Sequence, residues 1–257
     1  MNTPLETNLR LTSVEFDQTA GIQGDDELMD NSAYQRLVGK LMYATITRPD
    51  ISYAVQTLSQ FMQHPKRSHW EATIIVVGYL KGTVGQGIWL KAQPATTLTC
   101  WCDSDWATCP NTRRSVTGYI VKFGDSLVSW KSKKQQTVSR SSAEAEYRSM
   151  ASAVAEVTWL VGLFNELNVP IQMPITVWSD SKSAIQLAAN PVFHERTKHI
   201  EIDCHFIRDK VKTGLIQTEY VHTHQQIADL LTKGLSQAQH LHLLSKLGVL
   251  NILHPSA

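Results

Sequence analysis

Between residues 31 and 83 the chain alternates apolar and polar residues with a helical period. In residues 31–47 the apolar side chains recur every three to four positions, which places them on one helix face. Residues 48–64 repeat this pattern and carry Pro49 near their start, a residue that suits the first turn of a helix. A third such stretch, 67–83, reaches a helix stop at Gly82. The pattern predicts three helices that form a small helical subdomain.

From residue 97 onward the period changes, and strands alternate with helices. Leu98, Cys100 and Cys102 share one face of a strand-like run, and Gly124-Asp125 is a typical hairpin turn. The predicted elements are, in order, a strand at 97–105, two strands within 115–133, a helix at 142–168, a strand at 173–180, helices at 181–190 and 195–214, a strand at 216–223, and helices at 225–235 and 236–250. This order predicts an α/β fold with a mixed sheet.

These changes of pattern divide the chain into four parts. Residues 1–30 are polar and have no period, so we expect a loose N-terminal segment there. The other predicted parts are a helical unit at 31–92, an α/β domain at 96–235, and a C-terminal helix and tail at 236–257.

Composition and charge are those of an ordinary globular protein of 257 residues, with 42% hydrophobic and 18% charged residues. The net charge of +1 predicts no general affinity for polyanions, so any nucleic-acid contact must come from local clusters. Cys100, Cys102, Cys109 and Cys204 form no CxxC pair, which favours reduced thiols. Because no signal peptide or membrane-spanning run is visible, we expect a cytoplasmic or nuclear protein without a membrane partner.

Acidic residues stand where predicted elements begin or end. Asp103 and Asp180 each follow a strand, Asp229 lies near the start of a late helix, and a glutamate opens the long helix at 142–168. Carboxylates gathered at one sheet edge repel one another unless cations lie between them, and the matching ions are Mg²⁺ or Mn²⁺. A pair of such ions suits in-line phosphoryl displacement. Taken alone, Asp180 could equally be a helix N-cap.

Two glutamates compete for the position at the start of the long helix. Ser141 and Glu144 fit the S-x-x-E capping box, in which the glutamate folds back to the N-cap amide. Glu144 therefore has a structural task, whereas Glu146 lies beyond the cap and turns toward the predicted sheet. Glu146 is the catalytic candidate.

Basic residues gather between positions 111 and 140, where Asp125 is the one acid among them. This cluster predicts a track for a phosphate backbone, although a solvated strand edge protected by lysines would look similar. His224, just before the last acid, is a candidate for proton transfer or product release. The predicted nucleic-acid-binding residues are Arg113, Arg114, Lys131, Lys133, Lys134 and Arg140.

Several blocks match a known family. The blocks "CDSDWA", "RRSVTGYIV", "VSWKSKKQQTVSRSSAEAEY", "SDSKSAIQLAANPVFHERTKHIEIDCHFIRDKV" and "YVHTHQQIADLLTKGL" resemble the ribonuclease H domain of copia-type retrotransposon polyproteins over about residues 96–235. The helical stretch from "YQRLVGKLMYATITRPD" to "YLKGT" resembles the last part of the reverse transcriptase that precedes it. The chain thus resembles the C-terminal end of such a polyprotein.

The resemblance implies a ribonuclease H-like fold, with a five-stranded mixed sheet flanked by helices and preceded by the helical subdomain. It implies a metal-dependent endonuclease that hydrolyses the RNA strand of RNA–DNA hybrids with two Mg²⁺ ions, or Mn²⁺. By position, Asp103, Glu146, Asp180 and Asp229 correspond to the family's four metal-binding acids. Selectivity for hybrids would come from minor-groove contacts with 2′-hydroxyls. The implied partners are the hybrid and the polymerase portion of the polyprotein.

Two other functions compete with the active nuclease. One is a catalytically silent nucleic-acid-binding or interaction remnant, a reading favoured by the absence of the polymerase's "YxDD" motif, which also excludes polymerase activity. The other is a transposase- or integrase-like protein, whose last acid would be a glutamate on a late helix. The order Asp, Glu, Asp, Asp argues against it.

Overall fold

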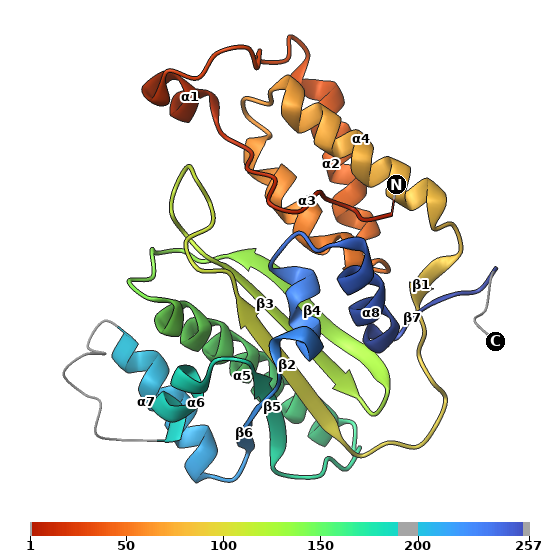
Figure 1. Cartoon of the computed structure of the whole chain (residues 1–257). Coiled ribbons are helices and arrows are strands. Elements are labelled where there is room, and N and C mark those ends of the chain that lie inside the picture. Colours follow the sequence, from red (N-terminus) through yellow and green to blue (C-terminus); the bar gives the residue numbers. More distant parts are fainter. Residues whose placement is uncertain (1, 190–199, 254–257) are drawn as a thin grey trace.

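The computed structural model describes residues 2–189 and 200–253 (Figure 1). Its centre is a five-stranded sheet in the order β4-β3-β2-β5-β6. β2 pairs antiparallel with β3 and parallel with β5, so the sheet is mixed, as the sequence predicts. A separate two-stranded ribbon joins β1 to β7. The strands are β1 Gln86–Ile88, β2 Leu98–Ser104, β3 Val116–Phe123, β4 Ser126–Lys134, β5 Ile175–Ser179, β6 Ile216–Tyr220 and β7 Val249–Asn251.

Helices cover both faces of this sheet. α5, α6 and α7 lie on one side, where Cys100, Cys102 and Val177 of the sheet pack against Met150 and Val154 of α5 in one core. The short η5 and α8 lie on the other side, over a second core. These elements are α5 Ser142–Glu166, α6 Lys182–Ala189, α7 Glu201–Lys212, η4 Thr223–Gln225, η5 Ile227–Leu231 and α8 Gln237–Leu247.

The helical unit has a core of its own beside the sheet, formed mainly by helices within residues 31–82. Tyr34, Val38 and Leu58 are fully buried in it, which confirms the apolar faces expected from the periodicity. Pro49 lies in the first turn of a 3₁₀ helix that leads into α3. The elements of the N-terminal part are α1 Val14–Ala20, α2 Asn31–Ala44, η1 Pro49–Ile51, α3 Ser52–Leu58, η2 Ser59–Phe61 and α4 Arg67–Gly82.

A buried polar network joins the helical unit to α8. The guanidinium of Arg48 pairs with Asp50 at 2.7 Å, and the Tyr79 hydroxyl donates to the same carboxylate at 2.7 Å. Nε2 of His240, on α8, lies 3.0 Å from the Tyr79 hydroxyl. All four residues are buried, so separating the helical unit from α8 would break these hydrogen bonds and cost free energy.

The N-terminal segment is more ordered than its polar sequence indicates. Leu5 and Leu11 are buried in the core of the helical unit, and residues 14–20 form α1. Lys66, almost fully buried at the start of α4, pairs with Asp17 and, at 2.8 Å, with Asp25. The expected loose segment is therefore corrected: ion pairs across nearly fifty residues of sequence hold it in place, and no local pattern signals them.

The helices predicted at 142–168 and 236–250 are present as α5 and α8, whereas the one predicted at 225–235 is wrong. Two short 3₁₀ turns replace it, because the side chain of Gln226 accepts from the N–H of Ala228 and donates to the carbonyl of Cys102, which holds the segment against the sheet. The beginning of the helix predicted at 195–214 lies outside the described residues. Within the described ranges, none of the helices combines the length and hydropathy that a membrane span requires.

We predict that acid destabilises the helical unit through His69. This fully buried ring stacks on Phe61, Nδ1 accepts from the N–H of Lys66, and burial lowers its pKa from 6.5 to about 4. As the pH falls below 6.5 the unfolded chain takes up the proton first, so the free energy of unfolding should drop by about 3 kcal/mol by pH 4. Urea unfolding at several pH values measures this drop.

The variant His69→Gln is the comparison, since its side chain does not titrate. It should be less stable than the wild type at pH 7 and lose less stability on acidification. Equal pH slopes for the two proteins would show that His69 is not responsible.

Candidate metal centre

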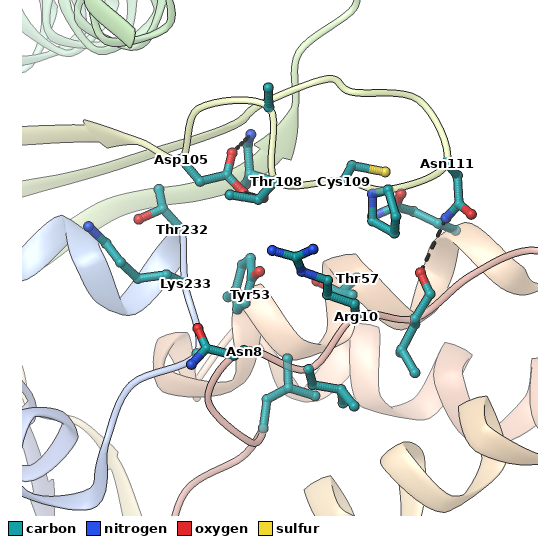
Figure 2. Close-up of a pocket in the computed structure, with 18 of the residues that line it drawn as sticks. Asn8, Arg10, Tyr53, Thr57, Asp105, Thr108, Cys109, Asn111, Thr232 and Lys233 are labelled. Atoms are coloured by element: carbon teal, nitrogen blue, oxygen red, sulfur yellow. Dashed lines mark hydrogen bonds between the residues drawn. The ribbon is translucent and has the colours of Figure 1, made fainter.

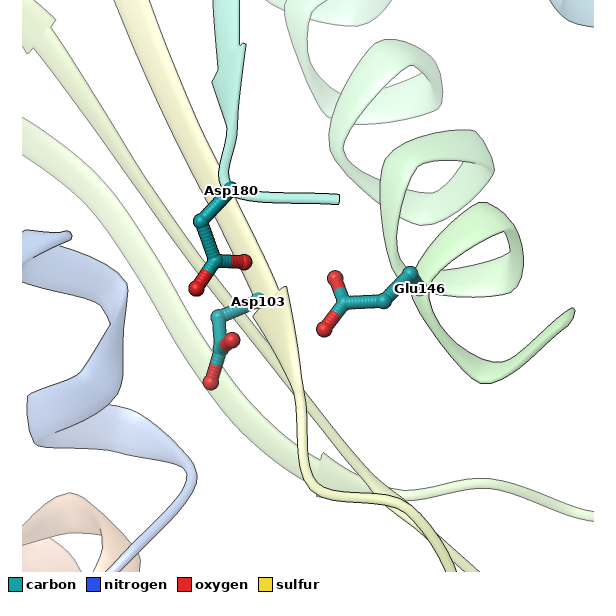
Figure 3. Close-up of side chains that lie close together, drawn as sticks. All are labelled: Asp103, Glu146 and Asp180. Atoms are coloured by element: carbon teal, nitrogen blue, oxygen red, sulfur yellow. The ribbon is translucent and has the colours of Figure 1, made fainter. Parts of the chain in front are cut away.

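Three of the four predicted acids meet at one edge of the sheet. Asp103 is near the end of β2, Asp180 directly follows β5, and Glu146 lies in the second turn of α5. Their ligand atoms all lie within 4.8 Å of one another, and Figure 3 shows the three carboxylates facing each other. The parallel pairing of β2 with β5 explains the meeting, because it brings two strand ends to the same edge.

The two glutamates of α5 have different surroundings. The Ser141 hydroxyl accepts from the N–H of Glu144 at 3.2 Å, as expected for an N-cap. The Glu144 carboxylate accepts from the N–H of Arg140 and pairs with Arg148 at 2.7 Å. The sequence predicted that the Glu144 carboxylate would accept from the N–H of Ser141. It accepts instead from the N–H of the preceding residue, Arg140. Glu146 instead faces Asp103 and Asp180 (Figure 3).

The fourth acid is linked to this group by a lysine. Asp229 is buried on η5, and Nζ of Lys233 lies 2.9 Å from its Oδ1. The same ammonium lies 3.5 Å from Oδ2 of Asp103, which also accepts a hydrogen bond from the hydroxyl of Thr232. Among the described residues, Asp229 does not belong to the three-acid group, although Lys233 contacts both it and Asp103.

Burial and mutual repulsion favour protonation of this cluster. Burial, reinforced by the charges of Asp103 and Asp180, raises the pKa of Glu146 well above its ordinary value. Burial and Asp103 also raise the pKa of Asp180, and they raise that of Asp229 to about 8. Oε2 of Glu146 is buried with no hydrogen-bond donor in the described part of the chain. Such a set of carboxylate oxygens is what a hard divalent cation binds.

A glycine allows η5 to approach the cluster. Gly118 of β3 lies opposite Asp103 in the sheet. A Cβ atom at Gly118 would come within 2.5 Å of the methyl group of Thr232 and 3.0 Å of Cβ of Leu231. Only a residue without a side chain therefore fits beneath the segment that carries Asp229.

The histidine predicted near this site, His224, lies on its rim together with His222. His222 and His224 are exposed and belong to the turn around η4. Thr223, between them, donates its hydroxyl to Oδ2 of Asp180 at 2.8 Å. This hydrogen bond places the turn beside the acids.

The predicted basic residues do not form one track. The exposed lysines Lys131 and Lys133 line a groove of about 430 Å³ between β4 and α5, together with Arg148. Lys134 also borders this groove, but its ammonium lies 2.9 Å from the thiol of Cys109. Arg113 lines a different cleft, and Arg114 and Arg140 are exposed in the neighbouring loops.

The cleft that Arg113 borders is also lined by Thr232 and Lys233, the two residues that contact Asp103; Figure 2 shows both at its edge. It measures about 370 Å³ and lies between the N-terminal segment, α3 and the loop after β2. Arg10 and Tyr53 line it on one side, and Thr232 and Lys233 border it on the side of the metal centre. Basic and acidic side chains both line this cleft, because Arg10, Arg113 and Lys233 share it with Glu6 and Asp105.

No protein-family model matches the chain, but similar proteins are known. The Pol polyprotein of transposon RE2 from Arabidopsis thaliana is 42% identical over 250 residues, 97% of this chain. That of transposon RE1 from the same plant is 45% identical over 226 residues, 88% of the chain. That of transposon TNT 1-94 from Nicotiana tabacum is 36% identical over 234 residues. The chain belongs to the copia-type retrotransposon Pol family.

This copia-type chain spans 17% and 15% of the lengths of the RE2 and RE1 polyproteins. Among solved structures, LC11-RNase H1, isolated from compost, is 12% identical and overlaps 53% of this chain and 93% of its own, with a TM-score of 0.42. The structure of LC11-RNase H1 in complex with an RNA/DNA hybrid has a TM-score of 0.40 and covers 53% of this chain and 94% of its own. The strand order and the flanking helices give the copia-type chain a ribonuclease H-like fold.

Lys233 and Thr232 of the copia-type chain are the site residues that sequence reasoning missed. Lys233 follows Asp229 by four positions, a spacing that pairs opposite charges on a helix. That signal was available in the sequence. The contact of Thr232 with Asp103 joins positions 129 residues apart, and no local pattern predicts it.

We predict that Gly118→Ala disturbs the metal centre without any change to an acid. The added methyl group should push η5 away from β3, lower the free energy of unfolding by about 1–3 kcal/mol and weaken Mn²⁺ binding. Chemical unfolding and metal titration measure both effects. Gly162→Ala is the control, because this exposed helical glycine has nothing within 4 Å of a new Cβ and its replacement should not destabilise the chain. Unchanged metal binding in Gly118→Ala would contradict the packing argument.

Proposed function

We propose that this copia-type chain is a metal-dependent endonuclease that hydrolyses the RNA strand of RNA–DNA hybrids. The observation that carries the proposal is the convergence of Asp103, Glu146 and Asp180 within 4.8 Å at the carboxyl ends of two parallel strands. Membership of the copia-type retrotransposon Pol family supports the same activity, because the sequence blocks resemble the ribonuclease H domain of that family.

The acids present fit divalent cations. The buried oxygen of Glu146 that lacks a donor, and the raised pKa values of Glu146 and Asp180, indicate carboxylates that need a positive charge between them. Asp103, Glu146, Asp180 and Asp229 would hold two Mg²⁺ or Mn²⁺ ions. When bound, the ions activate the attacking water and stabilise the leaving 3′ oxygen.

The protein's own residues would position the hybrid. Lys131, Lys133 and Arg148 in the groove beside β4 would hold one phosphate backbone, and Arg113 would hold the other strand along the cleft. Contacts with 2′-hydroxyls across the minor groove would mark the RNA strand. His224, on the rim near Asp180, would move a proton or help the product leave.

The first test is cleavage of a labelled RNA–DNA hybrid by the full chain with Mg²⁺ or Mn²⁺. We expect cuts in the RNA strand alone, with rates at least about 100-fold lower for Asp103→Asn and Glu146→Gln, since each removes a positioned catalytic group. Glu144→Gln is the matched control. It should cleave at a rate near the wild type and lose about 1 kcal/mol of stability, because the ion pair with Arg148 is lost while Ser141 still caps the helix.

Each alternative outcome has its own meaning. Loss of cleavage in Glu144→Gln but not in Glu146→Gln would reverse the assignment of the two glutamates. Hybrid binding without cleavage by the wild type in either metal would replace the nuclease with a silent nucleic-acid-binding module.

Hybrid binding should depend on salt through the basic residues. Lys133→Ala and Arg113→Ala are each expected to reduce the slope of log K against log salt concentration by about 1, because each removes one phosphate contact. Fluorescence anisotropy with a labelled hybrid, in Ca²⁺ to prevent cleavage, measures this slope. Lys212→Ala, at the exposed end of α7, is the control and should leave the slope unchanged. Unchanged slopes in Lys133→Ala and Arg113→Ala would show that neither the groove nor the cleft contacts the phosphates of the hybrid.

A further inference from the structure

We propose that Lys233 occupies the place of the second divalent cation, so that the chain binds one ion tightly and a second only when the lysine moves away. The inference rests on the proposed function, since it concerns the same acids. The role proposed for Lys233 is that of a cation held between two of these acids.

The position of the ammonium carries the argument. Nζ lies between two acids on different elements, 2.9 Å from Oδ1 of Asp229 on η5 and 3.5 Å from Oδ2 of Asp103 on β2. Asp103 and Asp229 are two of the four acids that would hold the ions. A cation that already contacts Asp103 and Asp229 competes directly for the ligands of a second ion, and it leaves the three-acid group open to the first.

Charge balance points the same way. Asp103 and Asp229 are nearly fully buried, so their negative charges need a partner close at hand. With all four carboxylates ionised, the acids and the ammonium carry a net charge of −3, which one divalent cation reduces to −1 and a second would reverse to +1. A second divalent cation beside Lys233 would add like charge at the same oxygens, so the lysine and the ion exclude each other.

The side chain of Lys233 has open space beside it into which it can move. Its side chain is 38% exposed, unlike the carboxylates that it contacts. It also borders the cleft lined by Arg10 and Tyr53, as Figure 2 shows. A displaced ammonium would therefore enter the predicted path of the nucleic acid and could pair with a phosphate there, while Thr232 still holds η5 to Asp103. The geometry thus links entry of the second ion to a contact with substrate.

The test is calorimetric titration of the full chain with Mn²⁺ in the absence of nucleic acid. The wild type should bind one ion tightly and a second at least about tenfold more weakly. Lys233→Met should bind two, with the affinity of the second raised by about tenfold or more. Lys233→Arg keeps the charge and should retain one tight ion. Lys212→Met, which removes an exposed lysine at the end of α7, should match the wild type.

Asp229→Asn keeps the inference testable if Lys233→Met does not fold, as judged by thermal unfolding. It should lose the weak ion and retain the tight one. Two ions of equal affinity in the wild type, or an unchanged second affinity in Lys233→Met, would overturn the role of Lys233 while leaving the nuclease intact. If neither protein binds Mn²⁺ and the wild type does not cleave hybrid, the proposed function itself fails.

Discussion

Repulsion among buried carboxylates is the constraint on which the rest of this structure depends. Asp103, Glu146 and Asp180 lie close together although burial and their neighbours' charges oppose the ionised state of Glu146 and Asp180. An arrangement of this kind lowers stability unless a cation or a proton compensates it. The hydrophobic cores on the two faces of the sheet supply the stability that holds the acids together.

The parts around the acids can be understood from this constraint. β2 and β5 hold two acids because they are parallel neighbours, and α5 adds the third from one face. The opposite face carries η5, which can approach only because Gly118 has no side chain. Lys233 and the hydroxyl of Thr232 then supply donors to Asp103 from that face. The site thus combines negative charge from one side with compensating donors from the other.

The helical unit is bound into this arrangement and is not a loose appendage. The network of Arg48, Asp50 and Tyr79 reaches His240 on α8, which packs beside η5. The N-terminal segment completes the cleft beside Lys233, since the carbonyl of Glu6 would lie 2.6 Å from a Cβ at Gly234. Tyr53 and Thr57, which lie in the stretch that resembles the end of a reverse transcriptase, line another wall of the same cleft.

The sequence by itself determined the elements that have a clear hydrophobic period and the interactions between residues close together in the chain. The helices at 31–47 and 67–83, the hairpin at Gly124-Asp125 and the separation of Glu144 from Glu146 all depend on residues a few positions apart. Tertiary structure alone decided the rest. The order of the N-terminal segment depends on Lys66 meeting Asp17 and Asp25, and the 3₁₀ turns around Asp229 depend on Gln226, which donates to the carbonyl of Cys102 and accepts from the N–H of Ala228. These contacts join distant segments, and their free energy comes from burial that no local pattern records.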